Sequence, residues 1–180
     1  MRQLRPYPTR AALDAMYARP HNGANWWEHR LRADLTVAFA CHLLPAAPVI
    51  DLSAGDAVIP RGIARGHTVT LGDYASGYEY VGPISETVQL LDNSSDAIFV
   101  CSETLEHVEQ PARLLYDIRP KCGSLILSTP ADDVDESNPE HIWTFSTGDV
   151  GHLLAAAGFV AAGFVVLDLP SYRCQIWAAR

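Results

Sequence analysis

Basic side chains and cysteines are scarce in this 180-residue chain, and long apolar runs are absent. Thirteen Lys and Arg stand against 21 Asp and Glu, a formal net charge of −8. A protein whose main partner is the nucleic-acid backbone usually carries a basic face, so nucleic acid is disfavoured as a partner. No apolar run approaches the ~18 residues that a membrane-spanning helix needs. The four cysteines form no C-x-x-C pair and no signal peptide is recognisable, which predicts reduced thiols and a cytoplasmic location.

The chain does have the length of one domain and a regular alternation of apolar strands with amphipathic segments. This alternation predicts an α/β fold with a mostly parallel sheet and helices on both faces. Strands are expected near 48–52, 67–72, 97–102 and 123–129, and helices near 57–65, 109–119 and 146–157. Two β-rich runs, 159–169 and 172–179, meet at Pro170-Ser171 and predict a closing antiparallel hairpin.

The first 45 residues differ from the rest, because two helices are expected there before any strand. The first spans 9–18 and the second 26–44, with Asn25 as the N-cap of the second. Helical spacing predicts that the second helix buries an apolar face made of Trp27, Leu31, Leu35, Ala38, Phe39 and Leu43. Far along the chain, the acidic stretch 131–140 contains no basic residue and is expected to be a solvent-exposed loop.

Polar side chains fall at the ends of the predicted strands. Asp51 follows the first strand and leads into the small-residue turn SAG, and Asp73 ends the second strand. Ligands of open parallel sheets bind at the carboxyl ends of the strands, and an acid at the second strand end commonly holds a ribose hydroxyl. Ser102 and Thr129 end the next two strands. The pattern therefore predicts a nucleotide-type ligand at this edge of the sheet.

Four segments together resemble the class I S-adenosylmethionine-dependent methyltransferases: VIDLSAGDA (49–57), TLGD (70–73), and the longer stretches 96–130 and 141–159. The resemblance covers about residues 45–180. It implies a Rossmann-like, seven-stranded, mostly parallel sheet with a C-terminal antiparallel hairpin. Residues 46–180 would form the S-adenosylmethionine-binding domain, and residues 1–45 a helical lid that contributes to the substrate pocket.

The same resemblance implies where S-adenosylmethionine would bind. The residues implied at the cofactor are Asp51, Ser53, Gly55, Asp73, Ile84, Ser85 and Ser102. Two departures stand out in the first turn, because Ser53 and Ala57 replace the family's usual first and third glycines. A side chain is strained wherever the backbone needs a positive φ. Pro83 stands where the family often has an acid near the adenine, and Ile84, Ser85 and Glu86 are the candidates to replace it.

The segment SETLEH carries the candidate catalytic groups, because methylation of a hydroxyl needs a base or a metal. Glu103, Glu106 and His107 stand at i, i+3 and i+4, and would share one face if a helix begins there. With His141 they resemble the metal site of small-RNA 3′-terminal 2′-O-methyltransferases, and E-x-x-E-H also occurs in ubiquinone-pathway O-methyltransferases. We expect His107, Glu106 and His141 near the acceptor, and a divalent metal on Glu103, Glu106, His107 and His141. The alternative is a histidine that only packs or hydrogen-bonds beside the site.

Three functional hypotheses follow from the residues and the resemblance. The first is O-methylation of a small-molecule acceptor by S-adenosylmethionine; the others are a nucleic-acid or nucleotide methyltransferase and a non-catalytic S-adenosylmethionine-binding module. Only residues 1–45 and 131–145 remain to build an acceptor pocket, so completion of the pocket in a homo-oligomer is an alternative to an open pocket. Trp26 and His29 could flank a sulfonium, whereas Trp27 is expected in the core.

Overall fold

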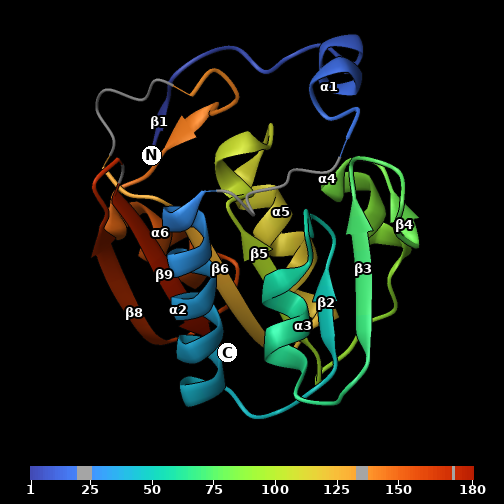
Figure 1. The fold of residues 1–180 in the computed structure, drawn as a ribbon, viewed down its shortest axis with the longest axis vertical. Coiled ribbons are helices and arrows are strands. Elements are labelled where there is room, and N and C mark those ends of the chain that lie inside the picture. The colour runs from blue at the N-terminus through green and yellow to red at the C-terminus, as the bar shows by residue number, and fades with distance from the viewer. Residues whose placement is uncertain (20–25, 133–137, 172) are drawn as a thin grey trace.

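The computed structural model describes residues 1–19, 26–132, 138–171 and 173–180. A seven-stranded sheet forms its centre, in the order β4-β3-β2-β5-β6-β9-β8 (Figure 1). The first five strands in this order run parallel, and β9 and β8 complete the sheet antiparallel. In chain order the strands are β2 (Val49–Asp51), β3 (Val69–Asp73), β4 (Tyr80–Val81), β5 (Ile98–Ser102), β6 (Ser124–Pro130), β8 (Ala161–Asp168) and β9 (Arg173–Ala179). The predicted seven-stranded sheet with its closing hairpin is confirmed.

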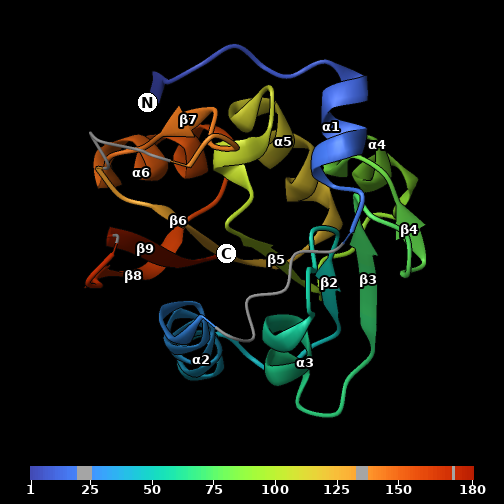
Figure 2. The same ribbon diagram turned by 45° about the horizontal axis from the view of Figure 1, so that its top comes forward.

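Helices cover both faces of the sheet, as predicted (Figure 2). On one face α2 (Trp27–Leu43) and α3 (Val58–Ala64) pack over the central strands, and Ile63, Ile98 and Ile126 are fully buried between them. On the other face lie α4 (Ile84–Thr87), α5 (Pro111–Ile118) and α6 (Thr147–Ala156), above a second core cluster. The central strands β5 and β6 are therefore buried on both sides, which explains their continuous apolar sequence.

Smaller elements complete the structure around this sheet. Helix α1 (Arg10–Met16) is the first predicted helix, and its N-cap Thr9 accepts a hydrogen bond from the Ala12 amide. β1 (Arg2–Gln3) pairs antiparallel with β7 (Trp143–Thr144), which ties the N-terminus to the segment before α6. Single 3₁₀ turns occupy 88–90, 105–107 and 119–121. Asn25, five residues of the acidic stretch (133–137) and residue 172 of the predicted hairpin lie outside the described residues.

Helix α2 has the predicted length but not the predicted buried face. Trp27 is 58% exposed, Leu31 38% and Leu35 37%, while Glu28 and Arg32 are buried. The reason is the position of the helix: its first half lies beside the polar carboxyl ends of β5 and β6, and only its second half meets apolar hairpin residues. Phe39 and Leu43, in that second half, do pack against the core as predicted.

No helix within the described residues is both long and apolar enough to cross a membrane.

Candidate active site

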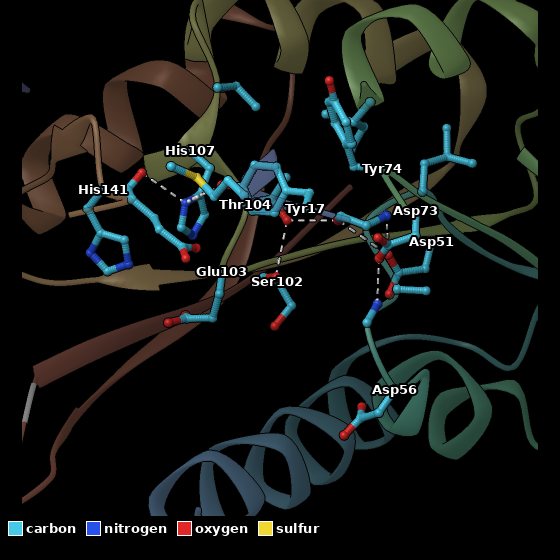
Figure 3. Close-up of a pocket in the computed structure, with 18 of the residues that line it drawn as sticks. Tyr17, Asp51, Asp56, Asp73, Tyr74, Ser102, Glu103, Thr104, His107 and His141 are labelled. Carbon is cyan, nitrogen blue, oxygen red and sulfur yellow. Dashed lines mark hydrogen bonds between the residues drawn. The ribbon is translucent and has the colours of Figure 1, made fainter. Parts of the chain in front are cut away.

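A cavity of about 510 Å³ opens at the carboxyl ends of β2, β3, β5 and β6 (Figure 3). This volume is within the range of ordinary small-molecule sites. All seven residues predicted at the cofactor line it: Asp51, Ser53, Gly55, Asp73, Ile84, Ser85 and Ser102. The predicted Glu103, His107 and His141 also line it, on the opposite side from Asp51 and Asp73. The sequence prediction therefore identified two groups of residues that one cavity brings together.

The turn after β2 is held in place by the two acids that the sequence singled out. Asp51 Oδ1 accepts a hydrogen bond from the Ser53 amide at 3.0 Å. Asp73 Oδ2 accepts one from the Gly55 amide at 2.9 Å, across to the neighbouring strand. The Ser53 hydroxyl lies 2.8 Å from the hydroxyl of Thr104, just after β5. The small-residue turn is thus tied to the ends of β3 and β5, with its backbone facing the cavity.

The substituted glycine position does require unusual backbone geometry. Ala57 has a φ of 58° and Gly55 a φ of 53°, both in the left-handed region. Only glycine adopts this region without cost, and another residue loses roughly 1 kcal/mol there. The strain expected at Ala57 is therefore present. Its small, fully buried side chain still allows α3 to begin directly beneath the turn.

Burial perturbs Asp51 strongly. Removal of the carboxyl group from water raises its pKa most, and the negative charge of Asp73 raises it further. The hydrogen bonds from Ser53 lower the pKa but do not cancel these two effects. Together they raise the pKa of Asp51 to about 7, from an ordinary value of 3.8. The carboxyl group is therefore half protonated near neutral pH, and a positively charged ligand placed beside it would favour the ionised form.

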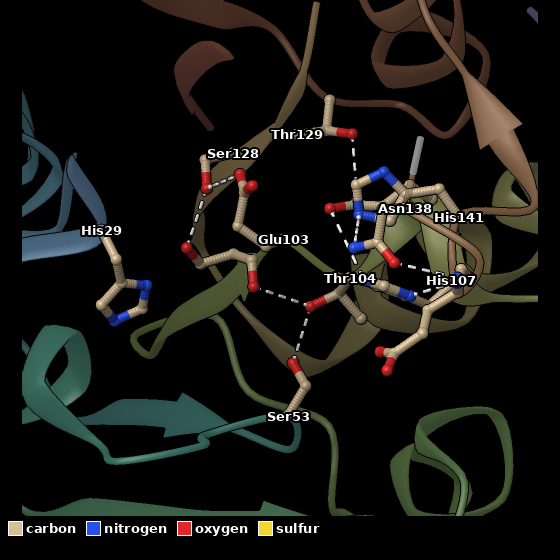
Figure 4. Close-up of polar contacts among 12 residues, drawn as sticks. His29, Ser53, Glu103, Thr104, His107, Ser128, Thr129, Asn138 and His141 are labelled. Carbon is tan, nitrogen blue, oxygen red and sulfur yellow. Dashed lines mark hydrogen bonds and ion pairs between the residues drawn. The ribbon is translucent and has the colours of Figure 1, made fainter. Parts of the chain in front are cut away.

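A buried arginine, which the sequence did not indicate, enters the cavity from α2. The Arg32 side chain is 3% exposed, and its Nη1 donates to the hydroxyls of Ser102 at 2.7 Å and Ser128 at 3.1 Å. Its charge faces Glu103, whose Oε1 lies 4.0 Å from Nη1. The same Oε1 accepts a hydrogen bond from Ser128 Oγ at 2.9 Å (Figure 4). Ser102 is therefore held by protein groups at the centre of the site.

This pairing separates Glu103 from the other predicted metal ligands. Glu103 has a φ of 50°, and residues 105–107 form a 3₁₀ turn instead of the α-helix that the i, i+3, i+4 argument assumed. The side chain consequently points toward Arg32. The structure brings only three of the four predicted ligands together: Glu106, His107 and His141 have donor atoms within 4.8 Å of one another.

The three remaining residues form a compact polar cluster at the other side of the cavity. Glu106 is fully buried behind the cavity wall, where Thr129 Oγ1 donates to its Oε2 at 3.0 Å. Its Oε1 has no hydrogen-bond partner among the described residues, and His107 Nε2 lies 3.8 Å away. Burial, followed by the charge of Glu103, raises the pKa of Glu106 well above its ordinary value. Burial therefore favours the neutral form of this carboxyl, and a bound cation would favour the ionised form.

Helix α1 reaches the same cluster through Tyr17 at its C-terminal end. The Tyr17 hydroxyl lies 3.2 Å from His107 Nδ1, and the backbone carbonyl of Glu140 lies 3.1 Å from the same nitrogen. Because a carbonyl can only accept, Nδ1 carries the proton and Nε2 keeps its lone pair toward Glu106. Burial and the neighbouring Glu140 raise the pKa of Tyr17, so its phenol stays protonated.

The aromatic residues are placed differently from one another. Trp26 and His29 line the cavity, and their rings stack at 6.2 Å. Trp27, expected in the core, is exposed instead.

Comparisons with known proteins identify solved structures of similar fold. No protein-family model matches the chain. No curated protein matches it either. Among solved structures it is similar to the 1,6-didemethyltoxoflavin-N1-methyltransferase of Burkholderia thailandensis, with a TM-score of 0.74, 18% identity, and coverage of 98% of this chain and 92% of that one.

Two further solved structures agree. The magnesium protoporphyrin IX methyltransferase of Synechocystis PCC 6803 has a TM-score of 0.66 at 15% identity, covering 94% of each chain. An S-adenosylmethionine-dependent methyltransferase of Leishmania major has a TM-score of 0.68 at 11% identity, covering 84% of this chain and 73% of that one. The Burkholderia and Synechocystis structures contain bound S-adenosylhomocysteine. The chain therefore has the fold of the class I S-adenosylmethionine-dependent methyltransferases.

Proposed function

We propose that this chain is an S-adenosylmethionine-dependent methyltransferase that methylates an oxygen atom of a small molecule. One observation carries the proposal: a single cavity holds the turn tied by Asp51 and Asp73 on one side and the histidine cluster on the other (Figure 3). A methyl donor anchored at the first side would face an acceptor held at the second. The similar structures with bound S-adenosylhomocysteine support the donor.

The donor side is built to hold a ribose and a cation. Asp73 uses one lone pair of each carboxylate oxygen on the backbone amides of Gly55 and Ala75, which leaves further lone pairs for ribose hydroxyls. When bound, S-adenosylmethionine supplies a methyl group on a positively charged sulfur. Ionised Asp51 would then gain a positive neighbour, so binding is expected to release a proton. The fixed turn would align the donor, and alignment alone can supply roughly 7–11 kcal/mol of the barrier.

The acceptor side is built to take a proton. His107 holds its own proton at Nδ1 against the Glu140 carbonyl, so its Nε2 is the basic atom. A hydroxyl acceptor must lose a proton as its oxygen attacks the methyl carbon, and an amine with a neutral lone pair needs no such base beforehand. The acceptor side therefore favours oxygen over nitrogen, although the similar Burkholderia enzyme is an N1-methyltransferase.

The cluster also suits a divalent cation, which we include in the proposal. Its donor set is one carboxylate and two imidazoles, a set that Zn²⁺, Fe²⁺ and Mn²⁺ accept. Glu106 Oε1 is a buried oxygen without a hydrogen-bond partner among the described residues. The donor atoms lie within 4.8 Å of one another, close to the separations of about 3–4 Å that bonds of about 2.1 Å require. Such a cation would lower the pKa of an acceptor hydroxyl, while the Glu140 carbonyl would keep His107 oriented.

We propose a small acceptor because α1 and the start of α2 line the cavity and would act as a lid over it. Tyr17 contacts His107, and the Asp14 carboxylate accepts from the Tyr74 hydroxyl at 2.6 Å, which fixes α1 above the site. The formal charge of −8 argues further against a polynucleotide.

Calorimetry with S-adenosylmethionine and S-adenosylhomocysteine tests the donor site. We expect binding of both and at least tenfold weaker binding after Asp73→Ala, with the exposed Asp92→Ala as the matched control. Acceptor chemistry is then tested with aromatic compounds that differ only in carrying a hydroxyl or an amino group, by following S-adenosylhomocysteine production. Absence of binding heat for both ligands would contradict the proposal.

The cation is tested separately by metal analysis and by titration of Zn²⁺ and Mn²⁺ into the purified protein. Glu106→Ala is expected to abolish stoichiometric metal binding, whereas the neighbouring exposed Glu109→Ala is not. Full methyl transfer in the presence of a chelator would remove the cation from the proposal and leave His107 as the base.

A further inference from the structure

Helix α2 presents an apolar face to solvent. Trp27, Leu31 and Leu35 are 58%, 38% and 37% exposed, and they follow one another at four-residue intervals along one side of the helix. Ala38 is exposed on the same side. In Figure 2 α2 forms the outer layer on its side of the sheet. Contiguous exposed apolar side chains rimmed by charges are typical of protein–protein contact sites.

The fold covers this face only in part. The inward side of the first half of α2 is occupied by Glu28, Arg32 and Thr36, all buried. Arg32 is fixed there by Ser102 and Ser128, so the helix cannot turn its leucines inward without withdrawing Arg32 from the site.

We propose that this face of α2 is the contact surface of a homodimer, in which the α2 helices of two copies pack antiparallel across a twofold axis. In such a pair, residues lie opposite each other when they are equally distant from a common midpoint along the helix. Three pairs of residues have nearly the same midpoint, which lies between position 32 and position 33. They are Trp27 with Ala38, Arg30 with Asp34, and Leu31 with Leu35. One helical residue corresponds to 1.5 Å, so all three pairs form together.

Each of these pairings is complementary. The largest side chain of the face, Trp27, meets the smallest, Ala38, and the two leucines meet each other. Arg30 and Asp34 are exposed along one edge of the face, and neither has an ion-pair partner among the described residues. The twofold axis brings the same edge of both helices together, so Arg30 of each copy meets Asp34 of the other. A parallel twofold pairing would place this edge of the two helices on opposite sides of the contact and leave Arg30 and Asp34 without cross-pairs, which makes a second copy in antiparallel orientation the fitting partner.

The interface is expected to be small, because one helix pair supplies it. A small interface makes a dimer that dissociates on dilution. It also adjoins the cavity, since His29 and Arg32 on neighbouring faces of α2 line the proposed active site.

Sedimentation velocity over a wide range of protein concentrations tests the dimer. We expect a concentration-dependent dimer for the wild-type chain and monomer for Leu31→Glu with Leu35→Glu. The matched control is Leu90→Glu, which changes a 70% exposed leucine outside α2 and is expected to leave the dimer intact. Far-UV circular dichroism confirms that each variant is folded. A wild-type monomer at every concentration, or a dimer unaffected by the α2 changes, would overturn the proposal.

Charge exchange tests the orientation of the two helices. Arg30→Asp alone and Asp34→Arg alone each place like charges opposite one another, and each is expected to weaken dimerisation at least tenfold. The double variant Arg30→Asp/Asp34→Arg restores both cross-pairs and is expected to recover the wild-type dissociation constant at low salt. Failure of the double variant to recover would overturn the antiparallel pairing, because each charge would then have a different neighbour.

Discussion

Replacing Asp51 by asparagine is expected to make the free protein more stable at alkaline pH and to leave it unchanged at acid pH. The Asp51 carboxyl is buried beneath the turn after β2, and its pKa is raised to about 7, chiefly by burial. In the unfolded chain the group ionises near its ordinary value of 3.8. Between these two values the unfolded state has lost the proton while the folded state retains it. The free energy of unfolding therefore falls as pH rises through this window.

The size of the effect follows from the same two values. Each pH unit between 3.8 and about 7 lowers the free energy of unfolding by about 1.4 kcal/mol. Over the whole interval the loss amounts to about 4 kcal/mol. Between pH 5 and pH 8 the expected loss is about 2.5 kcal/mol. The introduced asparagine would carry no charge, and its side-chain oxygen can still accept from the Ser53 amide, as the Asp51 carboxyl does. The variant is therefore expected to escape this loss.

Urea denaturation at pH 5 and pH 8 measures the difference directly. The free energy of unfolding of the wild type should fall between these pH values by about 2.5 kcal/mol more than that of Asp51→Asn. Asp92→Asn, at an exposed position, serves as the control and should follow the wild type. Parallel pH profiles for the wild type and Asp51→Asn would refute the reasoning, because they would mean that water or another group relieves the burial of this carboxyl.

Three further changes test other parts of the structure. Tyr17→Phe removes the hydroxyl beside His107 Nδ1 and should lower kcat about tenfold without a comparable change in stability, measured by steady-state kinetics and urea denaturation. Arg32→Met leaves the Glu103 carboxylate without its buried counter-charge and should lower the free energy of unfolding by about 3 kcal/mol. Gly123→Ala should lower it by about 3 kcal/mol or more, because a Cβ there would lie 1.8 Å from a backbone oxygen.

Each of these changes has a matched control in the chain. Tyr116→Phe alters an exposed phenol and should leave kcat unchanged. Arg61→Met removes an exposed arginine, for which a change within about 0.5 kcal/mol is expected. Gly148→Ala adds a methyl group where the nearest atom is 3.7 Å away, and should not destabilise α6. Equal effects in a variant and its control would contradict the corresponding argument.

The sheet, and the strand-end residues that line one side of the cavity, could be predicted from sequence because both depend on local signals. Apolar runs ending in Asp51, Asp73 and Ser102 locate the strand ends, and parallel strands bring these ends to one edge. The resemblance identified Ser53 and Ala57 as replacements of glycine, and of these two residues Ala57 has a positive φ while Ser53 does not. These features can be predicted once the strands are located in the sequence, and the alternation of apolar strands with helices locates them.

The acceptor side was predicted only in part, because it depends on contacts between distant segments. Arg32 meets Ser102 and Ser128 from 70 and 96 residues away, and nothing in the local pattern around it indicates this. Glu103 was assigned to the metal by helical spacing, but a left-handed residue and a 3₁₀ turn point it toward Arg32 instead. Spacing arguments fail where the assumed helix does not form.

The same contact explains the orientation of α2. If the helix turned so that Leu31 and Leu35 faced the sheet, it would bury the remaining exposed part of two leucines. Complete burial of such a side chain from full exposure contributes about 1.5–3 kcal/mol. It would also withdraw Arg32 from Glu103 and from the hydroxyls of Ser102 and Ser128, and each hydrogen bond to a charged group contributes about 1.5–3 kcal/mol. Because both leucines are already more than half buried, the available gain is the smaller of the two quantities. The polar contacts of Arg32 therefore favour the observed orientation of α2, which keeps the apolar face at the surface where we propose that a second copy binds.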